Sequence, residues 1–405
     1  MSAHPPYLIS WNITKRCNLF CGHCYLDAAE LSGVDAISTD EALRITAQAA
    51  SLAPGAMLVL TGGEPLLRPD IFDIISRAAE LGLSPVLGTN GTMLTKETCS
   101  RLLDAGIKGA GVSIDSLSPA FHDRFRGLPG AWEKTLSGME ALRAFNIPFQ
   151  MQFTVTKENR LELAEAASFA LERGALSMNF FFLVCTGRGQ KAADLTPEEY
   201  ETALEDIVKA EEEFGARVMV RARCAPHIVR VAERVNPQSP LVKGATCGCI
   251  AGKGYLRISP EGLVTACPYI PANGGSASVL KTPLKEIWEK DPSFLSLRAP
   301  ALSGRCANCC YKDSCGGCRA RASAATGNLM GEDPWCVYEP KGDEKKAATQ
   351  PAAPAWDPEA RERLEKIPAF LRPMIKKGLE RYAASKGIDT ITPELMAELR
   401  QKAGK

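Results

Sequence analysis

Short apolar runs alternate with amphipathic segments along the first two hundred residues. The runs have the length of buried strands, and the amphipathic segments have the apolar spacing of helices. The expected strands are 8–13, 57–60, 85–88, 111–115, 149–155 and 177–184, and the expected helices are 71–81, 96–105, 131–145 and 161–173. Such alternation predicts a parallel sheet with helices on its outside. About six βα units are present, fewer than the eight of a closed barrel, so we expect a partial, open (β/α)6 barrel over residues 1–200.

Three cysteines follow the first expected strand with the spacing Cys-x3-Cys-x2-Cys. They are Cys17, Cys21 and Cys24. A closed structural zinc site or a complete [4Fe–4S] site uses four protein ligands. Three thiolates on one tight loop therefore leave one coordination position of the metal site free for a substrate or cosubstrate. From these residues alone, a zinc knuckle or three unrelated buried thiols remain open as alternatives.

The stretch Cys17-Asn-Leu-Phe-Cys21-Gly-His-Cys24-Tyr resembles the cluster-binding motif of the radical S-adenosylmethionine (SAM) enzymes. The resemblance implies that the three cysteines hold a [4Fe–4S] cluster and that SAM chelates the fourth iron. It also implies the chemistry of that family. An electron from the cluster cleaves SAM and yields a 5′-deoxyadenosyl radical, which abstracts a substrate hydrogen.

Glycine and polar residues end the next three expected strands, where they face the same edge of the sheet. The pair at 62 and 63 allows close backbone approach to a ligand, and the carboxylate at 64 follows it. In the resembled family, a motif of this type contacts the amino group of SAM, and later strand ends contact its carboxylate and ribose. The resemblance therefore implies a SAM site made of Gly62, Gly63, Glu64, Asn90, Ser113 and Asp115. Alone, the two glycines would indicate an ordinary turn.

A second block of cysteines runs from Cys247 to Cys336. It resembles the SPASM extension of radical SAM enzymes, which carries auxiliary [4Fe–4S] clusters, through Gly262-x4-Cys267 and the Asp-Pro-Trp-Cys ending at 333–336. The resemblance implies one cluster on Cys306, Cys309, Cys315 and Cys336, and a second on Cys249, Cys267 and Cys318 with Cys247 as the candidate fourth ligand. Without Cys247, one iron of the second cluster would be open to water or substrate.

Several features of this block leave alternatives open. Only two residues separate Cys315 from Cys318, where the family pattern has three. Cys310 is adjacent to Cys309 and could replace it, and two zinc sites would use similar spacings. Three further cysteines, Cys99, Cys185 and Cys224, fall outside both motifs. We expect Cys99 to be a small buried apolar residue, and Cys185 to end a strand that faces the active site.

The composition excludes several classes of function. The net charge of +1 over 405 residues gives no electrostatic case for binding nucleic acid. No apolar run approaches the ~20 residues that span a bilayer. The N-terminus lacks the basic and apolar regions of a secretory signal. Since 15 cysteines without secretion favour metal ligation in a reducing compartment, we expect a cytoplasmic protein with no nucleic-acid partner and no membrane span.

The rest of the chain divides into four segments. We expect a helical connector at 201–243, next to a helix start at Thr196-Pro197, and the SPASM-like domain at 244–340. A linker at 341–355 is rich in Lys, Ala and Pro, cannot form a core and should be flexible. A small helical module follows at 356–405, with helix starts at Asp357-Pro358 and Thr392-Pro393.

The C-terminal module resembles the small C-terminal domain of the light-independent protochlorophyllide reductase subunit. The similarity rests on Ala360, Leu364, the Ile367-Pro368 pair and Tyr382-Ala383, among others. A generic helical docking tail is the alternative. A segment of this length is marginal as an independent core, so we expect it to pack on a partner or on the main body.

Residues 7 to about 340 are most similar to the radical SAM enzymes of heme d1 and alternative heme biosynthesis, notably over 182–189, 319–321 and 335–336. The resemblance implies a small-molecule substrate, a tetrapyrrole, whose side chain is removed or oxidatively decarboxylated. It also implies an electron donor such as ferredoxin or flavodoxin. In this scheme Arg188 could pair with a propionate, with a solvated loop arginine as the alternative.

Two other functions remain open. The first is a peptide- or protein-modifying SPASM maturase, although such enzymes often carry an N-terminal leader-binding domain and Cys17 comes too early for one. The second is a non-catalytic iron–sulfur electron-transfer protein. The Gly62-Gly63-Glu64 motif argues against the second, because an electron carrier needs no SAM site.

Overall fold

The computed structural model describes residues 4–28, 31, 33–184, 186–191, 195–243, 248–270, 272, 277–340, 354–365, 375–376, 378–380, 382–383 and 388–403. Two of the cysteines discussed above, Cys185 and Cys247, lie outside the described residues, as does most of the linker expected at 341–355.

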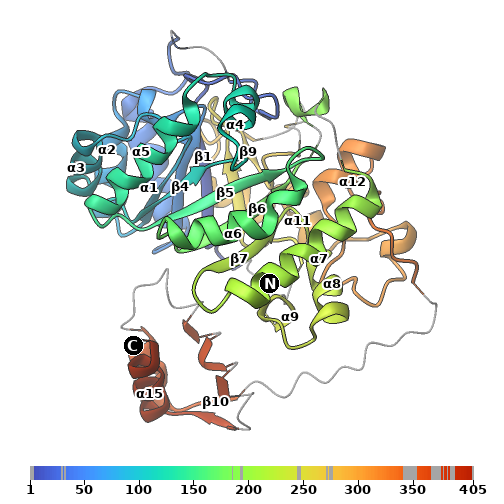
Figure 1. Cartoon of the computed structure of the whole chain (residues 1–405). Coiled ribbons are helices and arrows are strands. Elements are labelled where there is room, and N and C mark those ends of the chain that lie inside the picture. Colours follow the sequence, from blue (N-terminus) through green and yellow to red (C-terminus); the bar gives the residue numbers. More distant parts are fainter. Residues whose placement is uncertain are drawn as a thin grey trace.

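One sheet of nine strands forms the centre of the protein (Figure 1), in the order β7-β6-β5-β4-β3-β2-β1-β8-β9. All neighbouring strands are parallel except β8 and β9. The strands are β1 (Leu8–Thr14), β2 (Met57–Gly62), β3 (Ser84–Thr89), β4 (Gly109–Ser113), β5 (Phe149–Val155), β6 (Ser177–Phe182), β7 (Met219–Arg223), β8 (Tyr255–Ile258) and β9 (Val264–Thr265). The expected parallel α/β fold is therefore confirmed.

Helices follow the strands along the chain, as the alternation predicts. In the barrel they are α1 (Thr39–Leu52), α2 (Ile71–Glu80), α3 (Lys96–Asp104), α4 (Pro119–Arg126), α5 (Ala131–Ala144), α6 (Leu163–Glu172) and α7 (Pro197–Phe214). Beyond it lie α8 (Ile228–Val235), α9 (Pro240–Lys243), α10 (Leu284–Lys290), α11 (Pro292–Arg298) and α12 (Arg319–Thr326). Short 3-10 turns are η1 (Pro65–Leu67), η2 (Arg160–Glu162), η3 (Gly187–Lys191) and η4 (Gly304–Cys306). The expected helix start at Thr196 is a capping box with Glu199.

The two faces of the sheet differ in chemistry. The face toward the helices is apolar, and its residues alternate along β5 as Phe149, Met151, Phe153 and Val155, all buried in the main core. The opposite face, called the inner face below, carries mainly polar side chains. They include Ser10, Asn12, Thr61, Gln150, Gln152, Asn179, Arg223 and Arg257. Strand alternation thus gives the barrel an interior suited to a polar ligand.

The sheet extends beyond the six expected strands at both edges. On one side β7 pairs with β6, in the segment that we expected to be a helical connector. On the other side β8 of the cysteine-rich region pairs in parallel with β1, and Arg257 lies opposite Ser10. The auxiliary region is therefore continuous with the barrel sheet through β8.

The C-terminal module has a small core of its own. Its elements are β10 (Ala355–Trp356), α13 (Pro358–Glu365), β11 (Thr390–Ile391) and α15 (Pro393–Ala403), and β10 pairs in parallel with β11. The core contains Ala360, Leu379, Ala383, Ile391 and Leu395. Both expected helix starts are confirmed, since α13 begins at Pro358 and α15 at Pro393. The module is drawn apart from the barrel ribbon in Figure 1.

Within the described ranges, no helix is both long and apolar enough to cross a membrane.

Candidate active site and auxiliary cluster sites

The loop after β1 brings its three cysteines into one small apolar cluster. Cys17 and Cys21 are buried there with Leu19 and Ala28, and Cys24 packs against them. Burial raises the pKa of the Cys17 thiol to about 12, with the neighbouring Cys21, Glu64 and Cys24 adding to the effect. Three thiols thus share one water-poor pocket at the carboxyl end of a strand.

The loop after β6 clamps this cysteine loop. Arg188 donates from Nε to the Cys21 carbonyl oxygen at 3.0 Å and from a terminal nitrogen to the Ala28 carbonyl oxygen at 2.9 Å. Its guanidinium also lies 4.2 Å from the centre of the Phe20 ring. These contacts give Arg188 a role in supporting the cysteine loop, and its pairing with a propionate stays a prediction.

The Gly62–Glu64 turn fits against the start of the cysteine loop. Gly63 and Glu64 donate their amides to the carbonyl oxygens of Thr14 and Arg16, at 2.8 and 2.7 Å. A Cβ on Gly63 would overlap the Arg16 carbonyl oxygen and lie 3.0 Å from the Cβ of Cys17. Glycine at 63 is thus required by this close approach rather than by a positive φ.

Glu64 is completely buried at the strand edge. Its carboxylate accepts from the Thr89 hydroxyl at 2.9 Å, the Asn90 amide at 2.9 Å and the Leu66 amide at 3.3 Å. Burial raises the pKa of Glu64 to about 7, although these three donors pull it down. A buried carboxylate with such a pKa is an appropriate partner for a ligand ammonium group.

Asn90, which we expected to contact SAM, also supports the cysteine loop. The side-chain amide of Asn90 donates to Asn18 Oδ1 at 2.9 Å. The side-chain amide of Asn18 in turn donates to Thr92 Oγ1 at 2.8 Å. Asn18 lies between the first two cysteines of the loop and was not predicted as a site residue. Ser113 ends β4 and is half-buried on the inner face.

A buried ion pair connects Asp115 to the cysteine loop. Asp115 pairs with Arg126 at 2.6 Å, and both side chains are almost completely buried. Arg126 also donates to Cys21 Sγ at 3.8 Å. Burial alone would raise the pKa of Asp115, but the Arg126 guanidinium holds that pKa below its usual range. Asp115 is therefore placed to orient Arg126, and Arg126 stands beside a thiol that would carry negative charge as a ligand.

One auxiliary site gathers four of the expected ligands around a single cavity. Cys306, Cys309, Cys315 and Cys336 all line it. Backbone amides of Tyr311 and Gly317 donate to the sulfurs of Cys309 and Cys315, each at 3.4 Å, and Arg319 donates to Cys306 Sγ at 3.8 Å. Donors to the sulfurs stabilise thiolate ligands. Cys310 does not line this cavity, and its sulfur lies 3.6 Å from the Tyr338 hydroxyl.

The second set of thiols lies deeper in the protein. Cys318 and Cys267 pack together in one apolar cluster. Burial raises the pKa of Cys249 to about 11, and the Cys318 thiol is the neighbouring group that adds most to this rise. The Cys318 amide donates to Asp333 at 2.7 Å. The three expected ligands of the second cluster are thus neighbours, and the candidate fourth, Cys247, is not among the described residues.

These donor sets fit an iron–sulfur cluster better than a single ion. A zinc ion holds sulfur at about 2.3 Å and draws its four ligands tightly together. In the described part of the chain, no three His, Cys, Asp or Glu side chains stand close enough to hold one metal ion. A [4Fe–4S] cluster is held by cysteine thiolates, which is the donor set that these sites offer.

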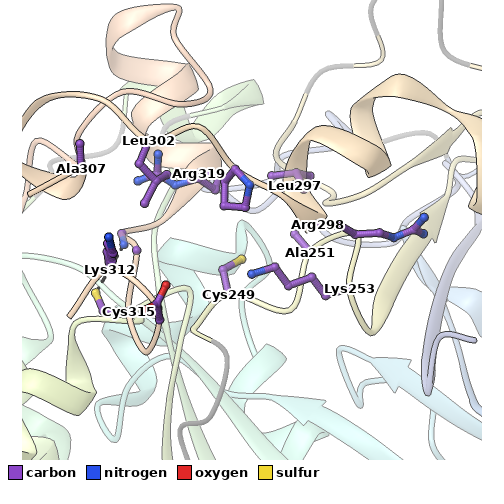
Figure 2. A pocket seen from close by; sticks show the side chains of 14 residues that line it. Cys249, Ala251, Lys253, Leu297, Arg298, Leu302, Ala307, Lys312, Cys315 and Arg319 are labelled. Atoms are coloured by element: carbon purple, nitrogen blue, oxygen red, sulfur yellow. Dashed lines mark hydrogen bonds between the residues drawn. The ribbon is translucent and has the colours of Figure 1, made fainter. Parts of the chain in front are cut away.

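An open cavity of about 580 Å³ lies between the two auxiliary sites. Its lining contains one thiol from each, Cys249 and Cys315, and the basic side chains of Lys253 and Lys312. Figure 2 shows Lys253 extending toward Cys249. The cavity therefore borders both auxiliary sites and is lined by more basic than acidic side chains.

The sequence matches two family models in this part of the chain. Residues 11–170 match the radical SAM superfamily, and residues 247–310 match the SPASM iron–sulfur cluster-binding domain. An AdoMet-dependent heme synthase of Methanosarcina barkeri is 40% identical over 83% of this chain and 97% of its own length. The chain belongs to the radical SAM superfamily. Its C-terminal residues 356–400 match the proto-chlorophyllide reductase 57 kD subunit model, which confirms that resemblance.

Other relatives of this radical SAM enzyme are named for different activities. A pre-heme d1 synthase of Dinoroseobacter shibae is 30% identical over 82% of this chain and 86% of its own. A PqqA peptide cyclase of Gluconobacter oxydans is 29% identical over 85% of this chain and 94% of its own. Streptococcus suis SuiB bound to S-adenosylmethionine shares the fold, with a TM-score of 0.66 and 17% identity over 82% of this chain and 77% of that one.

The protein is therefore an enzyme that uses [4Fe–4S] clusters and SAM. A reduced cluster bound by these thiols would supply the electron for reductive cleavage of SAM. The contribution of this chain is to bury the three thiols, to brace their loop through Arg188 and Arg126, and to hold Glu64 at the adjoining strand edge.

Gly63→Ala should strongly reduce SAM cleavage, because the added Cβ would push the Gly62–Glu64 turn away from the cysteine loop. Gly22→Ala is the matched control within that loop, since a Cβ there meets nothing within 4 Å. The measurement is 5′-deoxyadenosine formed by reconstituted protein with dithionite and SAM. Equal yields from both variants would contradict the tight fit described at Gly63.

Arg126→Gln should lower the free energy of unfolding by about 3–5 kcal/mol, because it leaves the Asp115 carboxylate buried without its cation. The double variant Asp115→Asn/Arg126→Gln should recover much of that loss. Arg124→Gln on the same helix breaks an exposed ion pair with Glu158 and should change stability by less than about 1 kcal/mol. Chemical denaturation of the four proteins gives the comparison. Similar losses for Arg126→Gln and Arg124→Gln would argue against a buried, coupled pair.

Proposed function

We propose that this radical SAM enzyme removes or oxidatively decarboxylates a carboxylate side chain of a tetrapyrrole. Support comes first from the relatives, since an AdoMet-dependent heme synthase matches over 97% of its length and a pre-heme d1 synthase also matches. The second support is a pair of inner-face arginines, Arg223 and Arg257, and it is the observation that carries the proposal.

Both arginines have amide oxygens as their hydrogen-bond acceptors. Arg223 donates from Nε to Asn179 Oδ1 at 2.9 Å, and Arg257 donates from Nε to Asn12 Oδ1 at 2.6 Å. Among the residues with described positions, no carboxylate forms an ion pair with either of them. Burial, together with the neighbouring charge of Arg221, lowers the pKa of Arg223 to about 10. A substrate carboxylate would relieve this unfavourable burial of positive charge.

Arg257 lies between the two metal-binding regions. Asn12, which accepts from Arg257, donates to the Tyr25 hydroxyl at 2.9 Å, and Tyr25 follows the last cysteine of the radical SAM loop. The Tyr25 ring meets Tyr269 edge to face at 5.2 Å. Tyr25 is also a neighbour of both Cys24 and Cys267. A carboxylate held by Arg257 would therefore sit within the polar interior that separates the SAM site from an auxiliary site.

Oxidative decarboxylation of a propionate suits this arrangement. One hydrogen atom leaves the methylene carbon attached to the ring and converts the deoxyadenosyl radical to 5′-deoxyadenosine. The bond to the carboxylate then breaks, CO2 leaves and a vinyl group forms. One electron remains and must pass to a one-electron acceptor, which is the chemistry that an oxidised auxiliary cluster supplies. An external donor such as a ferredoxin or flavodoxin provides the electron that cleaves each SAM.

Peptide modification is the second candidate, favoured by the 29% identity to a PqqA peptide cyclase. A peptide substrate would make different contacts in the interior of the barrel. A peptide backbone offers amides to Asn179 and Gln150 but does not require two arginines without acidic partners.

Arg257→Gln and Arg223→Gln should each weaken binding of a propionate-bearing tetrapyrrole by roughly 10- to 100-fold, the effect of losing a hydrogen bond to a charged group. SAM cleavage without substrate should be unchanged, because neither residue contacts the cysteine loop directly. Arg44→Gln, an exposed arginine on α1, is the control. Binding is measured by fluorescence quenching or by the Soret band of the tetrapyrrole. Unchanged affinity in both inner-face variants would count against a carboxylate substrate at this site.

A further inference from the structure

Cys224 belongs to none of the cysteine motifs, yet it lies among the thiols of the second auxiliary site. It directly follows β7, so it stands at the same carboxyl edge of the sheet as the radical SAM loop. We propose that Cys224 is the fourth thiolate ligand of the auxiliary cluster that Cys249, Cys267 and Cys318 hold.

The surroundings of Cys224 support this assignment. Its side chain packs in the same apolar cluster as Cys267 and Cys318. The thiols of Cys318 and Cys249 lie close enough to Cys224 to interact with it electrostatically. The thiols of Cys224, Cys249 and Cys318 lie close enough to Cys267 to interact with it in the same way. Four thiols from four separate chain segments thus lie together, three of them in one apolar cluster.

The backbone at Cys224 is held in an unusual conformation. Its φ of 56° lies in the left-handed region, which residues with a Cβ rarely adopt, and only two other non-glycine residues in the described ranges have positive φ. Such conformations persist where surrounding contacts impose them and are common at functional sites. Here the Cys224 carbonyl oxygen accepts from Arg321 at 2.9 Å.

The same arginine connects Cys224 to Cys318. Arg321 donates to Asp333 Oδ2 at 2.9 Å, and that oxygen also accepts from the Cys318 amide at 2.7 Å. The backbones of two proposed ligands are therefore braced by one ion pair whose side chains are at most 4% exposed. Outer partners that orient ligands in this way are a regular feature of metal sites.

Four thiolates complete the protein ligand set of a [4Fe–4S] cluster. With Cys224 in that set, no iron of this cluster is left open for the substrate, and Cys247 is not needed as a ligand. The second auxiliary cluster then serves electron transfer rather than substrate binding, and the substrate carboxylate is left to the inner-face arginines.

The experiment uses the full chain with Cys17, Cys21 and Cys24 all changed to alanine, so that only auxiliary iron remains. Cys224→Ala, Cys247→Ala and Cys99→Ala are compared in this background, and Cys99 is a buried cysteine on α3 away from both sites. After anaerobic reconstitution, iron per chain is measured, and electron paramagnetic resonance (EPR) spectra are recorded after reduction and after mild oxidation. Circular dichroism melting reports folding.

The parent should hold about eight irons per chain, four for each auxiliary cluster. Cys224→Ala should either fall to about four irons or give a three-iron EPR signal on mild oxidation that the parent lacks. Cys247→Ala and Cys99→Ala should match the parent. Cys224→Ser, which keeps the side-chain size and an oxygen donor, should fold like the parent and shift the reduced EPR spectrum.

Parent-like iron and parent-like spectra in both Cys224 variants would overturn the proposal, whatever Cys247→Ala shows. Because the readouts are iron and spectra in a background without the radical SAM cluster, they do not depend on the identity of the substrate.

Discussion

The contact between the cysteine loop and the Gly62–Glu64 turn is the constraint on which the site depends. Parallel strands bring β1 and β2 to a common carboxyl edge, and two amide-to-carbonyl hydrogen bonds then hold the two loops together. This leaves no room for a side chain at position 63. The buried thiols and the buried carboxylate of Glu64 are therefore adjacent because of the backbone, and the side chains of Arg188, Arg126 and Asn18 only brace that arrangement.

Much of the fold could be predicted because strands whose outer face is buried produce visible apolar runs. β7 was missed because Arg221 and Arg223 occupy its inner face, where polar side chains are tolerated, so its five residues contain no apolar run. The pairing of β8 with β1 joins positions about 245 residues apart and leaves no local pattern. For the site, spacing identified the motif cysteines. It could not identify Arg126, Asn18 or Cys224, whose positions beside the motif cysteines are set only by the folded chain.

Polar side chains on the inner face connect β8 to the cysteine loop. Arg257, Asn12 and Tyr25 form a hydrogen-bonded series from β8 through β1 to the end of the cysteine loop. Cys267 lies near Tyr25 on the other side. A substrate bound here would have the SAM site on one side and an auxiliary site on the other. Hydrogen abstraction and removal of the remaining electron would then occur at opposite sides of the same interior.

The most direct test of this account is a mass measurement on the product. Anaerobically reconstituted protein is incubated with dithionite, SAM and a propionate-bearing tetrapyrrole, and both the tetrapyrrole and 5′-deoxyadenosine are quantified. The account predicts that each modified side chain, weighed as the neutral acid, loses one CO2 and two hydrogen atoms, one abstracted from carbon and one the carboxyl proton. One 5′-deoxyadenosine should form for each. SAM cleavage with a tetrapyrrole of unchanged mass would contradict it.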